Sequence, residues 1–129
     1  MARLILDSGA VIALAAGNER ARHVLRRAAR ERILAVIPAV VIAETTRGGA
    51  RDAAVNWVIK AVDQVALVTD AVAREAGRLL AAAPTAKATI DALVAATAAR
   101  REPMVILTGD VDDLRALAAG YPHVRVERV

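Results

Sequence analysis

Apolar positions along the chain fall into two patterns, short continuous runs and runs with helical spacing. Continuous apolar runs of four or five residues indicate buried strands. They occur at residues 33–37, 65–68 and 104–107, and a shorter run, Leu4–Leu6, predicts a strand at residues 3–6. Val124 and Val126 suggest a further edge strand. Strands of this kind, buried on both faces, are typical of parallel sheets covered by helices.

Helical spacing fills the segments between these strands. Ser8 is expected to cap a first helix that Gly17 ends, and Pro38 is expected to begin another that Gly48 and Gly49 stop. Further helices are predicted at 19–32, 55–62, 70–83, 90–97 and near 114–117. The alternation of strands and helices predicts an α/β fold, and 129 residues predict a single domain over residues 1–129.

Two acids directly follow predicted strands. Asp7 comes after the first strand, and Asp110 follows residues 104–107 after Thr108 and Gly109. In open parallel sheets, ligands bind beyond the carboxyl ends of the strands. Taken singly, each Asp is also explained as a turn or helix-capping residue. The sequence leaves both interpretations open at this point.

Two other acids interrupt apolar helix faces. Glu44 shares a face with Val40 and Val41, and Asp91 lies on a helix made otherwise of Ala, Ile, Leu, Val and Thr. An ionised carboxylate on such a face is costly to bury unless it is paired or bound to a metal. The alternatives are an ion pair of Glu44 with Arg47 and compensation of the helix dipole by Asp91.

Asp112 and Asp113 suit the first turn of the helix after Asp110, where acids complement the dipole. We expect Asp112 to face solvent and Asp113 to support Asp110. Brought together, such carboxylates repel one another and raise each other's pKa, a penalty that a divalent cation removes. With no Cys and two His, the donors available are oxygens, which favour Mg²⁺ or Mn²⁺. Such ions assist phosphodiester cleavage.

The charge balance adds a candidate ligand. The chain has 18 Lys and Arg against 14 Asp and Glu. Nine acids remain when the five candidate site acids are set aside, namely Asp7, Glu44, Asp91, Asp110 and Asp113. The remaining surface is then strongly basic, as a phosphate-binding protein requires. Candidate RNA-binding residues are Arg22, Arg26, Arg47 and Arg51. A solvated helix face explains the charges of residues 19–32 equally well.

Aromatic residues and membrane segments are scarce. Trp57 and Tyr121 are the only aromatic side chains other than His, so RNA recognition is expected to rely on backbone shape and charge. The longest apolar run is too short to span a membrane and contains Pro38, while Asp7 argues against a signal peptide. We expect a cytoplasmic protein.

Four segments together resemble the PIN domain, the nuclease domain of VapC-type toxins of bacterial toxin–antitoxin pairs. They are LILDSGAVIAL, VIPAVVIAETTRGG, TIDALVAATAAR and VILTGDVDDLRAL. The resemblance implies a Rossmann-like α/β/α sandwich with a central parallel sheet. It also implies an Mg²⁺- or Mn²⁺-dependent ribonuclease acting on tRNA, rRNA or mRNA, often homodimeric and neutralised by a cognate antitoxin.

Carried over residue by residue, the resemblance implies a catalytic set of Asp7, Glu44, Asp91 and Asp110. Asp7, Asp91 and Asp110 would be the metal ligands, and Ser8, Thr108 and Asp113 would support the site. Two positions depart from the family pattern. Gly9 stands where a small polar residue is usual, and Ala88 stands where some relatives carry an acid.

Competing interpretations are a binding-only PIN domain, a receiver-like phosphoacceptor domain and a dinucleotide-binding fold. The retained four acids speak against a domain that binds without cutting. A receiver-like domain needs a Lys near its last strand, whereas the two lysines are Lys60 and Lys87. No G-x-G-x-x-G follows the first strand, which disfavours a dinucleotide site, and no P-loop is present.

Overall fold

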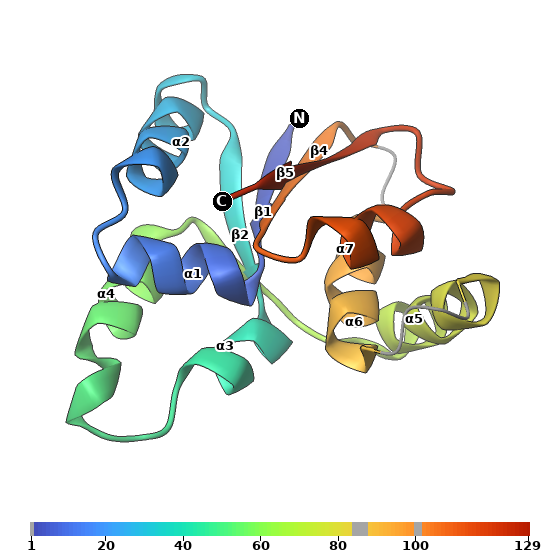
Figure 1. The fold of residues 1–129 in the computed structure, drawn as a ribbon, viewed down its shortest axis with the longest axis horizontal. Coiled ribbons are helices and arrows are strands. Elements are labelled where there is room, and N and C mark those ends of the chain that lie inside the picture. Colours follow the sequence, from blue (N-terminus) through green and yellow to red (C-terminus); the bar gives the residue numbers. More distant parts are fainter. Residues whose placement is uncertain (1, 84–87, 100–101) are drawn as a thin grey trace.

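Five parallel strands form one sheet in the computed structural model, which describes residues 2–83, 88–99 and 102–129 (Figure 1). Their order across the sheet is β3-β2-β1-β4-β5. The strands are β1 (Arg3–Leu6), β2 (Leu34–Pro38), β3 (Gln64–Ala66), β4 (Met104–Thr108) and β5 (Val124–Arg128). The predicted α/β fold with a central parallel sheet is confirmed.

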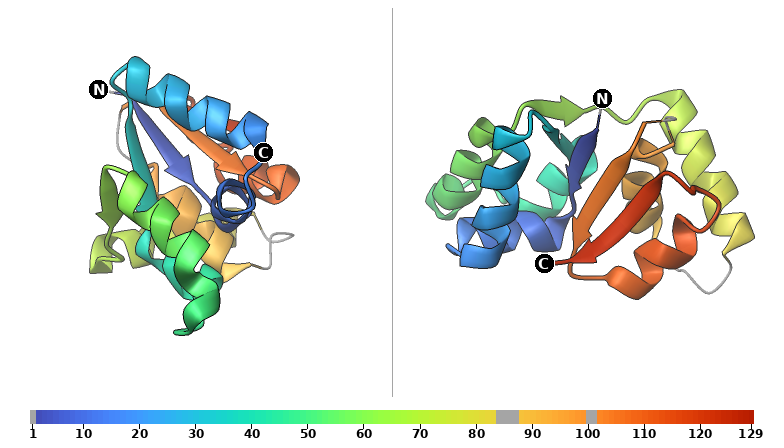
Figure 2. Two further views of the ribbon diagram at one scale, coloured as in Figure 1. Left: turned by 90° about the vertical axis from the view of Figure 1, so that its left-hand side faces the viewer. Right: turned by 90° about the horizontal axis from the view of Figure 1, so that it is seen from above.

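Helices connect the strands and cover both faces of the sheet. Figures 1 and 2 show α1 and α2 on one face, and α5, α6 and α7 on the other. The helical elements are α1 (Ser8–Ala15), α2 (Glu19–Arg30), α3 (Ala39–Thr45), η1 (Ala50–Asp52), α4 (Ala53–Ala61), α5 (Asp70–Ala82), α6 (Thr89–Thr97) and α7 (Val111–Leu117). Among the described residues, no helix has the length and hydropathy of a membrane span.

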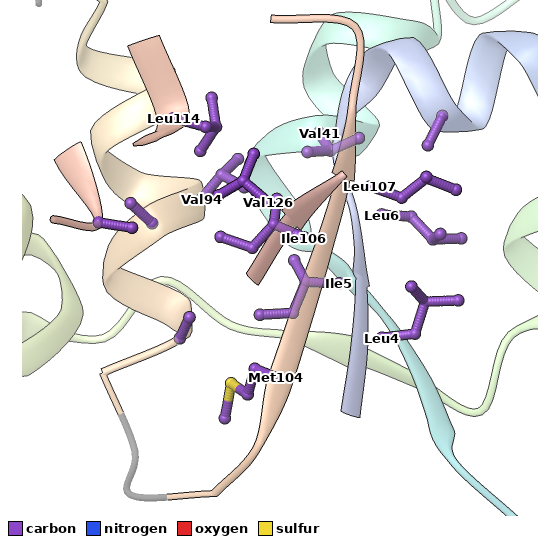
Figure 3. Close-up of a cluster of buried hydrophobic side chains, with 14 of the residues drawn as sticks. Leu4, Ile5, Leu6, Val41, Val94, Met104, Ile106, Leu107, Leu114 and Val126 are labelled. Atoms are coloured by element: carbon purple, nitrogen blue, oxygen red, sulfur yellow. The ribbon is translucent and has the colours of Figure 1, made fainter. Parts of the chain in front are cut away.

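The core is aliphatic and lies on both sides of the central strands. Ile5 and Ile106 are paired in register and point toward α6, while Leu6 and Leu107 point to the opposite face (Figure 3). All four side chains are at most 2% exposed. Burial of both faces explains why these strands are continuous apolar runs in the sequence.

The strand order reverses at the centre of the sheet, between β1 and β4. From β1 the order runs to β2 and β3 on one side and to β4 and β5 on the other. Crevices at such a switch point, beyond the carboxyl ends of the strands, are the usual ligand sites of open α/β sheets. Helix α3 follows β2 at this edge and packs against both α1 and α6. The three helices α1, α3 and α6 therefore meet beside the ends of β1 and β4.

Three predicted boundaries are wrong. The cap of α1 is Asp7 instead of Ser8, which is the first helical residue. Pro38 ends β2 instead of opening α3. The helix then ends at Thr45, before Gly48, where the hydroxyls of Thr45 and Thr46 bond back to carbonyl oxygens one turn earlier.

The predicted strand at 65–68 is also too long. Its counterpart β3 is an edge strand that pairs with β2 alone, and the last pair in register is Pro38 with Ala66. Because β2 ends there, residues beyond Ala66 have no neighbouring strand to bond. Leu67 is consequently 73% exposed.

Candidate active site

Asp7 is held by contacts at both carboxylate oxygens. It is 2% exposed, and its backbone is extended, with φ −76° and ψ 172°. Oδ1 accepts a hydrogen bond from the Ser8 amide at 2.8 Å, and Oδ2 accepts one from the Thr108 hydroxyl at 2.6 Å. Asp7 is thus a helix cap, as its simpler interpretation proposed, and at the same time it is tied to β4.

Thr108 links the ends of the two central strands. Its hydroxyl donates to Asp7 and accepts from the backbone N–H of Asp110 at 2.9 Å. The side chain is completely buried, so the hydroxyl position is fixed by these two bonds. Asp110 occupies the N-cap position of α7, as its simpler interpretation proposed, but its carboxylate makes no capping bond to the helix in the described chain.

Asp91, Asp110 and Asp113 form a tight acidic cluster. One carboxylate oxygen of each lies within 4.8 Å of the other two. Burial raises the pKa of Asp91 to about 7, helped by a hydrogen bond with Asp110 and by the negative charges of Asp7, Asp110 and Asp113. The charge of Asp110 likewise raises the pKa of Asp113. Asp112 is exposed, as predicted.

Glu44 reaches this region from α3. Its side chain is half-buried, and its Oε1 atom is buried without a hydrogen-bond partner among the described residues. The guanidinium of Arg47 donates to the backbone oxygens of Ala43, Glu44 and Thr46. No ion pair joins Arg47 to the Glu44 carboxylate in the described structure, so that alternative does not hold. A buried carboxylate oxygen without a donor is costly unless a ligand completes it.

A cavity of about 660 Å³ brings together Asp7, Glu44, Asp91 and Asp110. Asp113 belongs to the acidic cluster but is not part of the described lining. The remaining lining residues are Ser8, Gly9, Ile12, Ala88, Thr89, Ile90 and Gly109. The sequence interpretation missed Ile12, although its position one turn after Ser8 on α1 was a usable signal.

The four candidate arginines lie outside this lining as far as the structure describes it. Arg22 and Arg26 are on α2, and Arg26 pairs with Glu19 at 3.5 Å. Helix α2 borders a different cavity, at the amino ends of β1 and β4. Arg47 and Arg51 follow Glu44 along the chain, and both are exposed.

Gly9 allows a close approach of α1 to the turn after β4. A Cβ atom on Gly9 would lie 2.8 Å from the backbone N of Gly109 and 3.2 Å from its Cα. Both distances are shorter than ordinary van der Waals contact. The missing side chain therefore lets the segment carrying Asp7 pack against the segment carrying Thr108 and Asp110. This gives a structural reason for the departure from the family pattern at Gly9.

Gly9→Ala is expected to lower the free energy of unfolding by about 1–3 kcal/mol, because the added methyl group overpacks against the Gly109 backbone. Helix propensity alone predicts the opposite sign, a gain of up to about 1 kcal/mol. Gly109→Ala is the matched control, since its Cβ would meet nothing nearer than 4.0 Å. Urea unfolding of both variants decides the matter, and a stabilised Gly9→Ala protein would contradict the close-approach account.

Fold and site together define an α/β protein with an acidic cavity at the switch point of a parallel sheet. The family model for the PIN domain matches residues 4–120, and the chain belongs to this family. The family predicted from the four sequence segments is confirmed. No curated protein matches the chain by sequence.

Several solved structures share the fold. One is VapBC2 from Rickettsia felis bound to a DNA fragment from its promoter, with TM-score 0.76, 12% identity, and coverage of 100% of this chain and 99% of that chain. Another is DNA-bound VapBC from Salmonella typhimurium, with TM-score 0.76, 19% identity, and coverage of 99% and 98%. FitAcB from Neisseria gonorrhoeae has TM-score 0.67, 20% identity, and coverage of 95% of both chains. At these identities the likeness establishes the fold.

Proposed function

We propose that the protein is a metal-dependent endoribonuclease and the toxin of a type II toxin–antitoxin pair, acting as one domain over residues 1–129. The observation that carries the proposal is the cavity in which four carboxylates from α3, α6 and the ends of β1 and β4 converge. Membership of the PIN family and the fold shared with toxin–antitoxin complexes support it.

The donor set fits a hard divalent cation. All candidate ligand atoms are carboxylate oxygens, the ligands that Mg²⁺ and Mn²⁺ prefer. Glu44 Oε1 is buried without a hydrogen-bond partner among the described residues, and burial together with the neighbouring acids raises the pKa of Asp91, as expected at a carboxylate site that a cation would complete. Asp7, Asp91 and Asp110 would hold the ion, which supplies activation of water and neutralisation of charge on the phosphate.

The other side chains around the cavity would have separate roles in the reaction. Thr108 and the Ser8 amide fix the orientation of Asp7, and Thr108 also holds the backbone of Asp110. Glu44 positions the attacking water through its unpaired Oε1 and accepts its proton. Asp113 supports Asp110 from one turn further along α7. Cleavage would leave 5′-phosphate and 3′-hydroxyl ends.

We also propose that the protein binds RNA and a protein partner. RNA would approach along basic side chains, and the candidate contacts are Arg47 and Arg51, which follow Glu44 along the chain, and Arg22 and Arg26 on α2. A cognate antitoxin would bind the toxin, as the complexes with the same fold suggest, and relieve inhibition of translation and growth. We further propose a homodimer that acts in the cytoplasm.

The proposal is tested by incubating the purified chain with a panel of structured RNAs, including tRNAs, in Mn²⁺, Mg²⁺ or EDTA. We expect cleavage with either metal, none in EDTA, and products whose 5′ ends carry phosphate. Titration of Mn²⁺ without RNA is run in parallel. A folded protein that binds Mn²⁺ and leaves the whole panel intact would contradict the nuclease proposal and favour a binding-only PIN domain.

A further inference from the structure

The acidic cavity is larger than a metal site alone requires. Its volume of about 660 Å³ lies in the range of pockets that hold whole small molecules. A cation with its ligand oxygens fills only a part of such a space. The rest of the cavity must accommodate parts of the substrate beyond the phosphate group.

The part of the lining that is not acidic is largely apolar. Ile12 of α1 and Ile90 of α6 contribute branched aliphatic side chains, and Ala88 adds a methyl group. Ile12 is 55% exposed, an unusual state for a large aliphatic side chain next to four carboxylates. The other large exposed hydrophobic residues, Trp57, Leu67 and Val68, are not part of the lining in the described structure. Exposed apolar surface inside a cavity indicates a ligand with an apolar face.

The apolar part of the described lining therefore comes from α1 and from the start of α6, and it offers aliphatic surface against which a flat group can pack.

We propose that Ile12 and Ile90 form a subsite for the nucleobase next to the scissile phosphate. This inference rests on the proposed nuclease function. A ribonucleotide joins a phosphate, which suits the acidic part of the cavity with its cation, to a base with two apolar faces. Aliphatic packing against those faces does not read base edges, so the subsite accepts all four bases. It also supplies affinity in a chain that has few aromatic residues for stacking.

The test measures binding of the Mn²⁺-loaded protein to the four nucleoside 5′-monophosphates and to ribose 5-phosphate, which lacks a base. Isothermal titration calorimetry gives each Kd without any cleavage reaction. We expect each nucleotide to bind about tenfold more tightly than ribose 5-phosphate, because the base buries apolar surface of Ile12 and Ile90. Ile12→Ala removes most of this difference, whereas Ile12→Leu retains it.

Leu67→Ala is the matched control, since Leu67 is also an exposed aliphatic residue and lies outside the described cavity lining. It is expected to leave all Kd values unchanged. Equal affinity for nucleotides and ribose 5-phosphate would overturn the subsite and leave the metal-dependent nuclease intact. So would an Ile12→Ala protein, folded by circular dichroism, that still prefers nucleotides. If Mn²⁺ promotes binding of neither compound, the subsite and the proposed function fail together.

Discussion

Asp91→Asn is expected to reduce metal-dependent RNA cleavage by more than about a hundredfold, beyond the loss typical of residues that only support a metal ligand. Asp91 is a half-buried member of the acidic cluster, and its replacement removes one of the proposed metal ligands. The loss should be accompanied by weaker Mn²⁺ binding, measured by calorimetry on the same protein.

The same substitution is expected to stabilise the metal-free protein at pH 8. Burial and the neighbouring acids raise the pKa of Asp91 to about 7 in the folded protein, above its ordinary value of 3.8. A carboxyl with a raised pKa favours the folded state below about pH 4, and this contribution is lost as the pH rises to about 7. At pH 8 the ionised Asp91 therefore costs stability that Asn does not.

We expect a gain of about 1–2 kcal/mol at pH 8, because solvent screens part of the effect at a half-exposed group. The gain should shrink toward pH 4, as urea unfolding in EDTA would show. Asp112→Asn is the matched control, since Asp112 is an exposed acid of the same acidic segment outside the cluster. Cleavage that survives in Asp91→Asn would contradict its role as a ligand.

Asp7→Ala is expected to abolish cleavage as well, but with the opposite effect on stability. The substitution removes the side-chain cap of α1, which contributes about 1 kcal/mol. It also leaves the completely buried Thr108 hydroxyl without its acceptor, at a cost of about 1–3 kcal/mol. The free energy of unfolding should fall by about 2–4 kcal/mol, measured in urea at neutral pH.

Asp70→Ala provides the comparison for Asp7. Asp70 also lies at the start of a helix, but its partner is Arg74, and both side chains are about 80% exposed. Such exposed pairs contribute little, so the expected loss is below about 1 kcal/mol. Equal losses in the two variants would refute the account of Asp7 as a buried link between β1 and β4, and an active Asp7→Ala protein would refute its catalytic role.

Much of the site could be predicted because its residues violate local patterns. Glu44 and Asp91 interrupt apolar helix faces, and Asp7 and Asp110 follow strands that the sequence locates well. In a parallel sheet those strand ends meet at one edge, so their proximity followed from the fold class. The fold class itself followed from continuous apolar runs separated by helical spacing, and the structure confirms it.

The remaining features depend on contacts between distant segments, which periodicity does not report. Both Asp7 and Ser8 are good capping residues, and the choice between them is made by the Thr108 hydroxyl, 101 positions from Asp7. In the sequence Gly9 is an ordinary small residue. Its close contact with the Gly109 backbone is visible only in the folded structure. Exposure of Ile12 inside the cavity likewise requires the positions of α3 and α6.

The placement of β4 between β1 and β5 also determines when the acidic centre comes into existence during synthesis. Asp7, Glu44 and Asp91 are all translated before Met104–Thr108, the strand that pairs with β1 and carries the hydroxyl that orients Asp7. Pairing across so long a stretch of sequence is a late event in folding. A nascent chain that has not yet released β4 from the ribosome cannot assemble the centre. If the protein is the proposed nuclease, its synthesis order delays activity until β4 has left the ribosome.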